Sequence, residues 1–415
     1  MNYIEGLGQK AQKAKKSLAT ASTGQKNEIL TRIAAKLLEN QEQILAENEK
    51  DIANARENGI SETMVDRLRL TPERIQGISD ACIQLTNLED PVGEIIEGST
   101  RPNGMKISKI RVPMGVVGII YESRPNVTVD AASLCIKSGN AAILRGGKEA
   151  ICSNKVLMNT MREAVALCGF PEDIVQLVED TSREVSTQMM QANGLIDVLI
   201  PRGGAGLIQA VVKNATLPVI ETGTGNCHIY VDATADLAMA VNITDNGKTQ
   251  RPSVCNALET CLVHKDVAEE FLPMLKAKLD EHQVEIRGCE RTAAILGDCV
   301  VPATEQDYAT EFLDYIISIK VVDSVEEAIA HVSKYSTGHS ECIVTESYAN
   351  ARKFQEEVDS ACVYVNCSTR FTDGGEFGLG AEIGISTQKL HARGPMGLKE
   401  LTTMKYLICG DGQIR

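Results

Sequence analysis

Apolar residues recur every three or four positions through much of residues 1–90. The clearest stripe has charged residues between its members and consists of Leu30, Ile33, Ala34, Leu37, Leu38 and Leu45. Because an α-helix makes one turn in 3.6 residues, this spacing predicts helices with one apolar face. Such a face normally packs on a neighbouring element, so we expect a helical layer at the start of the chain.

From Ile110 onward, short apolar runs alternate with helical patterns. The predicted strands are Val116–Tyr121, Ala141–Leu144, Ile174–Val178, Asp197–Ile200 and Val219–Glu221. Helices are expected from about Val129 and over Glu149–Leu167. Alternating strands and helices predict a parallel sheet with helices on both faces, and ligands bind such sheets at the carboxyl ends of the strands.

A second alternating region begins near Cys255. Its predicted strands are Leu258–Val263, Ala293–Leu296, Ile316–Val322, Glu341–Thr345 and Val363–Asn366, with a helix over Glu326–Tyr335. A short terminal strand is expected over Lys405–Cys409. The fold class is therefore α/β, with more than one parallel-sheet domain.

Composition narrows the possible functions. A chain of 415 residues is long enough for two domains, and a net charge of −14 argues against nucleic acid as a partner. No run of eighteen apolar residues predicts a membrane span, and the polar start of the chain lacks the pattern of a signal peptide. The thirteen cysteines form no C-x-x-C pair and no zinc-binding spacing, so we expect reduced thiols in a cytoplasmic protein and no metal.

One cysteine lies in a polar, cationic context. Asn246–Ala257 (NGKTQRPSVCNA) places Cys255 close to Lys248 and Arg251. Neighbouring positive charge favours the thiolate, which is the form that attacks a carbonyl. A buried structural cysteine is the alternative interpretation.

Two glycine-containing segments follow predicted strands and precede predicted helices. They are Arg145–Lys148 (RGGK) and Gly203–Gly206 (GGAG). Glycine lets the backbone approach a ligand closely, a helix N-terminus attracts anions, and Arg145 and Lys148 add positive charge. Plain turns remain an alternative, and neither segment matches the Rossmann or P-loop fingerprint.

Four longer motifs carry a family resemblance. They are Pro113–Ile120 (PMGVVGII), Tyr121–Thr128 (YESRPNVT), Lys248–Asn256 (KTQRPSVCN) and Gln388–Gly397 (QKLHARGPMG). In this order they resemble the aldehyde dehydrogenase superfamily, and within it the branch that reduces γ-glutamyl phosphate. The resemblance spans nearly the whole chain.

The resemblance implies catalytic roles for four residues. Cys255 matches the nucleophile, and Glu221 stands where oxidising relatives keep the base that activates water. In a reductase Glu221 would only order the site, and a plain loop carboxylate is the other interpretation. The oxyanion-binding asparagine of the superfamily aligns with Ser123, and Asn126 is the second candidate donor.

The resemblance also implies residues for the cofactor and the substrate. Arg145 and Lys148 would meet the 2′-phosphate of NADPH. Gly146, Gly203 and Gly204 would approach its other phosphates.

Glu311 matches the glutamate that holds the nicotinamide ribose, with a surface carboxylate as the alternative. The candidates for binding the substrate phosphate and carboxylate are Arg124, Arg251, Arg370 and Arg393.

The implied reaction is NADPH-dependent reduction of L-glutamyl 5-phosphate to L-glutamate 5-semialdehyde, through a thioester at Cys255, on the route to proline. The implied domains are residues 1–94 and 112–223 for NADPH, 224–395 for catalysis, and a hairpin at 95–111 with the tail 396–415 for oligomerisation. A homo-oligomer is expected, and association with glutamate 5-kinase is left open. The competing hypotheses are an aldehyde dehydrogenase that oxidises and hydrolyses, supported by Glu221, and a catalytically inactive scaffold.

Overall fold

The chain forms two compact units, each built around its own parallel sheet. The computed structural model describes residues 2–122 and 124–415, without the side chain of Thr63. The first unit contains the chain up to Thr222 together with Gly378–Gly384 and Met396–Arg415. The second contains Gly223–Phe377 and Ile385–Pro395. Residues 378–384 thus fall in the first unit, although the sequence motifs group them with the catalytic domain.

The first unit begins with helices, as the apolar spacing predicts: α1 (Tyr3–Ala19), α2 (Thr23–Glu39), α3 (Gln41–Glu57), α4 (Glu62–Leu68) and α5 (Pro72–Thr86). Capping boxes at Asn2 and Ser22 satisfy the first backbone donors of α1 and α2. The predicted stripe does not form one continuous helix face, because α2 ends at Glu39 and α3 begins at Gln41. Within α2, Leu38 lies outside the buried face and is exposed.

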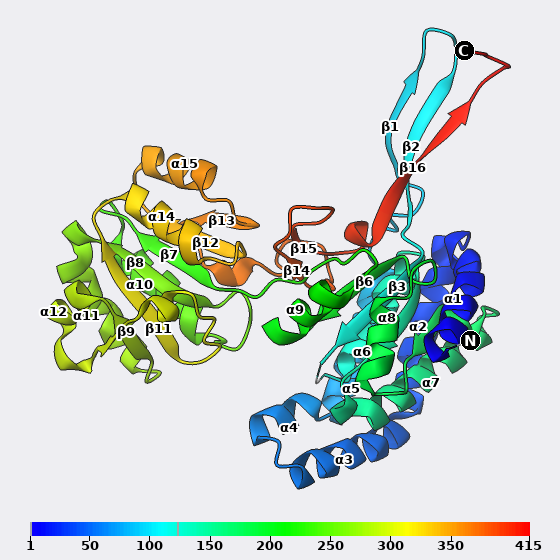
Figure 1. Ribbon diagram of the computed structural model, residues 1–415, viewed down its shortest axis with the longest axis horizontal. Coiled ribbons are helices and arrows are strands. Elements are labelled where there is room, and N and C mark those ends of the chain that lie inside the picture. The colour runs from blue at the N-terminus through cyan, green and yellow to red at the C-terminus, as the bar shows by residue number, and fades with distance from the viewer. Residues whose placement is uncertain (1, 123) are drawn as a thin grey trace. The chain divides into compact units, whose positions relative to one another are not determined.

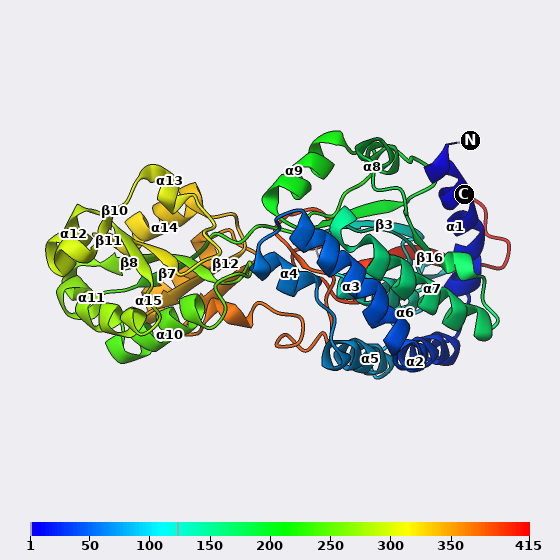
Figure 2. The same ribbon diagram turned by 90° about the horizontal axis from the view of Figure 1, so that it is seen from below.

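The sheet of the first unit has the parallel strand order β5-β4-β3-β6. Its strands are β3 (Val116–Tyr121), β4 (Ala141–Arg145), β5 (Val175–Leu177) and β6 (Val198–Arg202). Its helices are α6 (Asn126–Lys137), α7 (Ile151–Leu167), α8 (Arg183–Met190) and α9 (Ala205–Asn214). In Figure 2, α6 and α7 lie on one side of β3, with α8 and α9 on the other.

One strand predicted for this unit is absent from its sheet. Val219–Glu221 makes only an isolated bridge, in which Val219 pairs with Leu199. A run of three apolar residues is too short to predict how many backbone hydrogen bonds it makes to a neighbouring strand. Here the Pro218 carbonyl accepts from the Leu199 N–H, and the Ile220 N–H donates to the Leu199 carbonyl.

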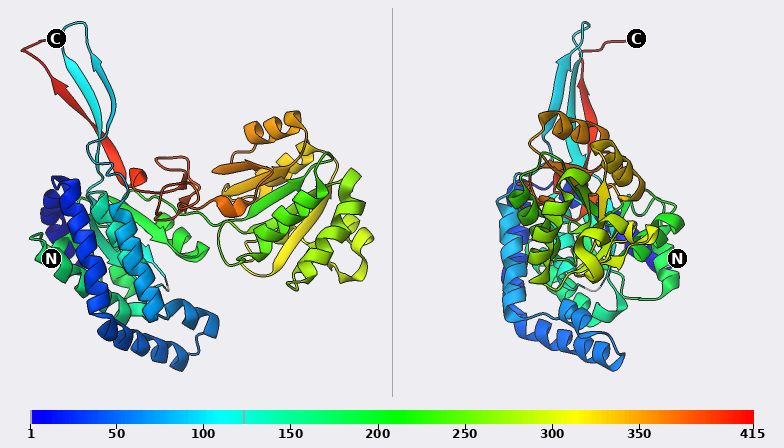
Figure 3. Two further views of the ribbon diagram at one scale, coloured as in Figure 1. Left: turned by 180° about the vertical axis from the view of Figure 1, so that it is seen from behind. Right: turned by 90° about the vertical axis from the view of Figure 1, so that its left-hand side faces the viewer.

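A separate antiparallel sheet joins distant parts of the sequence. It consists of β1 (Ile95–Thr100), β2 (Lys106–Pro113) and β16 (Thr402–Cys409), with β2 in the centre. The predicted hairpin and terminal strand are thus confirmed, and they pair with each other. Figures 1 and 3 show this sheet extending away from the rest of the first unit.

The second unit contains a parallel sheet of seven strands, in the order β10-β9-β11-β8-β7-β12-β13. The strands are β7 (Cys227–Val231), β8 (Leu258–His264), β9 (Glu285–Gly288), β10 (Val301–Pro302), β11 (Ile316–Val322), β12 (Ser340–Val344) and β13 (Cys362–Val365). Its helices are α10 (Leu237–Thr249), α11 (Lys265–Asp280), α12 (Glu290–Leu296), α13 (Glu305–Tyr308), α14 (Val325–Tyr335) and α15 (Tyr348–Glu357). The short antiparallel pair β14 (Ile385–Ser386) and β15 (Gly394–Pro395) also belongs to this unit.

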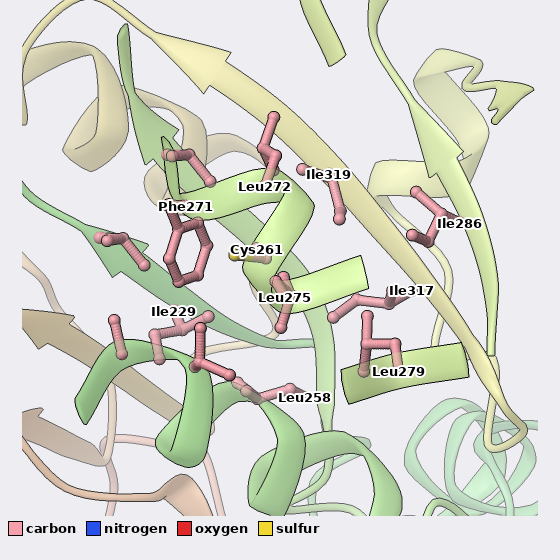
Figure 4. Close-up of a cluster of buried hydrophobic side chains, with 14 of the residues drawn as sticks. Ile229, Leu258, Cys261, Phe271, Leu272, Leu275, Leu279, Ile286, Ile317 and Ile319 are labelled. Carbon is pink, nitrogen blue, oxygen red and sulfur yellow. The ribbon is translucent and has the colours of Figure 1, made fainter. Parts of the chain in front are cut away.

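Alternating side chains build two cores on this sheet. Figure 4 shows Phe271, Leu275 and Leu279 of α11 packed toward Cys261 of β8 and Ile319 of β11. The opposite face carries α14 and α15, whose apolar residues cluster with Tyr230, Leu262 and Ile343. The central strands β7, β8 and β12 therefore bury both of their faces, as expected for a parallel sheet.

The prediction of a strand over Ala293–Leu296 is wrong, because these residues form the end of α12. A short apolar run fits either a strand or a buried helix turn, and the two alanines favour a helix. Strand β9 was not predicted, since its sequence Glu285–Gly288 contains a single apolar residue.

Five short 3₁₀ helices complete the secondary structure of the described residues: Lys148–Ala150, Glu172–Ile174, Gly297–Cys299, Thr369–Phe371 and Lys399–Leu401. The α/β class and the parallel sheets agree with the sequence prediction. Among the described helices, none is both long and apolar enough to span a membrane.

Candidate active site

Cys255 lies in the loop between α10 and β8, where it is only half-buried. Six of the thirteen cysteines are buried, and burial raises the pKa of Cys82 and of Cys135 to about 12. Cys135 and Cys342 are fully buried among apolar residues. Because the loop precedes β8, the thiol lies at the amino edge of its sheet. The rule that ligands bind at the carboxyl edge therefore does not locate this residue.

Gly225 packs its backbone directly against that of Cys255. A Cβ atom at position 225 would lie 1.4 Å from the Cys255 carbonyl oxygen, so only glycine fits there. The Gly225 N–H donates to Glu311 Oε1 at 2.7 Å. Glu311 is half-buried, and burial raises the pKa of its carboxyl group. The structure thus connects Glu311 to the thiol loop through one glycine that the sequence reasoning did not identify.

Cys227 is hydrogen-bonded to the backbone of the thiol loop. Its thiol is buried and donates to the Cys255 carbonyl, with 3.2 Å between sulfur and oxygen. On the same strand, the ring of His228 lies near Asn226 and the Glu341 carboxylate instead. Alternation along the strand therefore separates the Cys227 and His228 side chains.

Lys248 does not present an unpaired positive charge to the thiol. Its side chain is fully buried, and its Nζ lies 2.6 Å from Glu259 Oε2 and 2.9 Å from the Leu258 carbonyl oxygen. The proposed electrostatic role of Lys248 is corrected accordingly: the Glu259 carboxylate neutralises it. Sequence reasoning missed this partner because an acid inside an apolar strand gives no local signal.

Arg370 provides positive charge close to the thiol loop. Burial and the charge of Arg251 lower the pKa of Arg370, while Cys255 and Asp373 act in the opposite sense. The Arg370 Nε donates to Gln250 Oε1 at 3.0 Å. An arginine remains charged in spite of such a shift, so the guanidinium is a suitable anion-binding group.

Asn256 holds the segment that carries Arg370. The Asn256 Nδ2 donates to the carbonyl oxygens of Arg370 and Thr372, and the Asn256 carbonyl oxygen accepts from the Thr369 hydroxyl. Arg251 is exposed, and no hydrogen bond or ion pair to it is found within the described residues. The structure therefore brings Arg251, Arg370 and Cys255 into one region of the second unit.

Arg393 is hydrogen-bonded to Asp359 of the second unit. Its guanidinium donates to Asp359 Oδ1 at 2.8 Å and to the Asp359 carbonyl oxygen. Its role in substrate binding stays a prediction.

The two glycine loops of the first unit follow β4 and β6, at the carboxyl edge of that sheet. Gly146 packs against Asn154 and the ring of Tyr121, which leaves no room for a side chain. Arg145 Nη2 donates to the Thr181 carbonyl at 3.1 Å, while Lys148 is exposed. The Arg145 Nε is buried without a hydrogen-bond partner among the described residues, and burial lowers the pKa of this side chain.

The second loop already holds a carboxylate. The Gly204 N–H, at the N-terminus of α9, donates to Glu122 Oε2 at 2.9 Å, and the Glu122 carboxylate fills the space next to Gly203. A helix N-terminus that binds a carboxylate is suited to other anions as well. Glu122 was not identified from the sequence.

The remaining predicted residues also lie in the first unit. Asn126 donates from Nδ2 to Asp130 Oδ2 at 2.8 Å, and Arg124 and Glu221 are half-buried. Ser123, the other candidate oxyanion donor, lies outside the described residues. In the part of the chain that the structure describes, no group of His, Cys, Asp and Glu side chains could hold a metal ion.

Comparison with known proteins shows the family to which this chain belongs. Residues 3–297 and 300–407 match the model of the aldehyde dehydrogenase family. The gamma-glutamyl phosphate reductase of Carboxydothermus hydrogenoformans is 59% identical over 415 residues, covering 100% of both chains. The crystal structure of gamma-glutamyl phosphate reductase from Thermotoga maritima superposes with a TM-score of 0.98 at 52% identity, again over 100% of both chains. An acetylating aldehyde dehydrogenase from Geobacillus thermoglucosidasius shares the fold, with a TM-score of 0.71 at 17% identity over 99% of this chain and 97% of its own.

Proposed function

The chain is an oxidoreductase that belongs to the gamma-glutamyl phosphate reductases of the aldehyde dehydrogenase family, and we propose that it reduces L-glutamyl 5-phosphate to L-glutamate 5-semialdehyde with NADPH. The observation that carries the proposal is the half-buried Cys255 thiol within electrostatic range of Arg370. A thiol is needed to form an acyl intermediate, and a cation is needed to hold a phosphorylated substrate. The product would enter proline biosynthesis.

The first step is attack of the Cys255 thiolate on the γ-carbonyl carbon of the substrate. The new C–S bond replaces the C–O bond to phosphate, so inorganic phosphate leaves and a thioester remains on Cys255. Arg370 and Arg251 would stabilise the phosphate, because their charges lie near the thiol and near each other. Arg124 and Arg393 remain proposed contacts for the α-carboxylate. Asn126 remains the described candidate donor to the oxyanion.

The residues of the first unit fit a bound NADPH. The orphaned buried Nε of Arg145 and the close packing of Gly146 match an anionic ligand that approaches the backbone. Lys148, Gly203 and Gly204 would hold its phosphates. Glu311 remains a proposed contact for the nicotinamide ribose. When bound, NADPH supplies the hydride that reduces the thioester to a thiohemiacetal, from which Cys255 departs as thiolate.

The direct test is the reverse reaction of the purified protein. With L-glutamate 5-semialdehyde and NADP⁺, we expect NADPH formation only when inorganic phosphate is present, because phosphate must cleave the thioester. Cys255→Ala should abolish turnover, while Cys299→Ala, at an exposed cysteine, should leave it unchanged. Turnover at the full rate without phosphate would instead identify a hydrolysing aldehyde dehydrogenase with Glu221 as its base.

We further propose that the sheet β1-β2-β16 pairs copies of this chain. Its exposed apolar residues include Ile95 at 68%, Tyr406 at 58% and Ile408 at 59% exposure. Its two outer strands also carry unpaired edges, which sheets normally cover.

Light scattering should give a mass of at least two chains, and Tyr406→Lys with Ile408→Lys should reduce it. Tyr348→Lys, at an exposed site on α15, is the control. A monomeric wild-type protein would contradict this assignment.

All thirteen cysteines are free thiols, which supports a reducing, cytoplasmic compartment.

A further inference from the structure

A buried ion pair closes the base of the thiol loop. Lys248 is in the last turn of α10 and Glu259 is near the start of β8, so residues 249–258 between them include Cys255. Both side chains have 0% exposure, and the pair is joined at 2.6 Å. The Lys248 Nζ also bonds to the Leu258 carbonyl, so it ties both ends of the loop together.

This pair is not explained by stability alone. Burial raises the pKa of Glu259 and lowers that of Lys248, which means that both charged forms are opposed by their surroundings. Buried ion pairs contribute little to stability compared with well-packed apolar residues of similar volume. A charged pair kept at such a place therefore points to a role in positioning.

The second oxygen of Glu259 reaches another part of the site. Glu259 Oε1 accepts from the Leu313 N–H at 3.2 Å. Leu313 has a left-handed backbone with φ of 56°, which is a strained conformation for leucine. Glu259 therefore holds the segment that presents Glu311, which in turn binds the Gly225 N–H next to Cys255.

We propose that Lys248 and Glu259 form a positioning clasp that fixes the Cys255 loop and the Glu311 segment relative to each other. The clasp does not contact substrate; it acts through Cys255, Gly225 and Glu311. The expected effect of the clasp on turnover rests on the proposed function. Its expected effect on the position and labelling of Cys255 does not. Misplacing a nucleophile slows the chemical step more than it weakens substrate binding.

The test removes the charges in two ways. Lys248→Met combined with Glu259→Leu replaces the pair by apolar side chains of similar size. Glu259→Gln keeps an acceptor for the Leu313 N–H but removes the negative charge. Lys353→Met with Glu357→Leu is the matched control, since this pair is joined at 2.7 Å on exposed parts of α15.

Two readouts separate positioning from folding. The first is steady-state kinetics, where we expect the double variant to lose about 10- to 100-fold in kcat with KM for the semialdehyde within about threefold of wild type. The second is the iodoacetamide labelling rate of Cys255 by mass spectrometry, with the exposed Cys299 and Cys409 of the same molecule as internal references. We expect the Cys255 rate to change severalfold while the reference rates stay constant.

A double variant that melts like wild type and retains kcat within twofold, with unchanged Cys255 labelling, would overturn the clasp. If the double variant does not fold, Glu259→Gln decides, because unchanged kcat and labelling in this variant would also overturn it. Labelling does not require turnover. Failure of phosphate-dependent reduction in the wild type would therefore refute the proposed function while leaving the clasp measurable.

Discussion

The thiol loop of the second unit and the glycine loops of the first unit differ in whether their polar side chains have hydrogen-bond partners within the protein. Around Cys255, polar side chains are paired within the unit: Lys248 with Glu259, Glu311 with Gly225, and Asn256 with the Arg370 segment. Around Arg145, by contrast, a buried donor has no partner in the described residues, and Lys148 is exposed. A nucleophile must be held before its substrate arrives, whereas a nucleotide site must keep donors available for a ligand that comes and goes.

The strongest test of the rigid thiol loop is Gly225→Ala. A Cβ 1.4 Å from the Cys255 carbonyl oxygen forces the backbone carrying the thiol to move. We expect kcat to fall by at least about 100-fold, because a displacement of about 1 Å in a catalytic group has that effect. Steady-state kinetics with the semialdehyde and phosphate would measure it.

Gly24→Ala on α2 is the matched control. Its nearest neighbour, Ser22 Oγ, is 3.9 Å from the added Cβ, so we expect full activity and a slightly raised melting temperature. Wild-type kcat in Gly225→Ala would show that the loop tolerates displacement, and the contrast between the two regions would then be lost.

The proposed role of the Arg145 loop in cofactor binding is tested by Arg145→Ala. Loss of charge-assisted hydrogen bonds worth about 1.5–3 kcal/mol should raise KM for NADPH by roughly 10- to 100-fold. KM for NADH should change much less, because NADH lacks the 2′-phosphate.

Arg183→Ala, at an exposed position on α8, is the control for removing a positive charge from this unit. Equal KM values for the two nucleotides before and after the Arg145 substitution would remove Arg145 from the cofactor site.

A smaller effect is expected on the pH dependence of stability, because a partly buried carboxyl group of the first unit lacks the lysine partner that Glu259 has in the second unit. Glu259 has a lysine hydrogen-bonded to it, whereas Asp130 accepts from the Asn126 amide and has the charge of Arg202 near it. Burial nevertheless raises the pKa of Asp130 to about 6. Since the unfolded pKa is about 3.9, the folded state holds the proton more tightly. Stability should therefore fall as the pH rises from about 4 to about 6, and the full cost is present above that range.

Asp130→Asn removes this cost while keeping an oxygen acceptor for Asn126. We expect the variant to be more stable than wild type by about 1–3 kcal/mol at pH 7.5, with little difference at pH 4. Urea unfolding at both pH values measures it. A loss of stability at pH 7.5, or an equal gain at both pH values, would show that the Asp130 carboxylate is better solvated than its surroundings suggest.

Some elements of the fold were predictable because their signals are local. Strands β3 and β11 have the predicted bounds, Val116–Tyr121 and Ile316–Val322, because their apolar runs are long and bounded by clear breaks. Ala293–Leu296 was assigned wrongly because a four-residue run carries no reliable period.

Within the candidate site, residue type and motif alone predicted roles for Cys255 and the two glycine loops, and these roles stay predictions. Sequence reasoning misjudged the surroundings of Lys248, whose proximity to Cys255 in sequence suggested a charge effect that the ion pair with Glu259 cancels. It also missed Gly225, because that glycine meets the thiol only when β7 and β8 pair, with Cys227 opposite Leu258.

The sequence by itself determined the α/β class, the family motifs, the candidate thiol and the cationic glycine loops. Each depends on residue type and on spacings of a few positions. Only the tertiary structure decided which groups meet: the parallel order of β7 and β8 brings Gly225 to Cys255, and the buried pair forms where α10 leads into β8. Strand order and side-chain burial arise from packing over the whole sheet, so no local stretch of sequence encodes them.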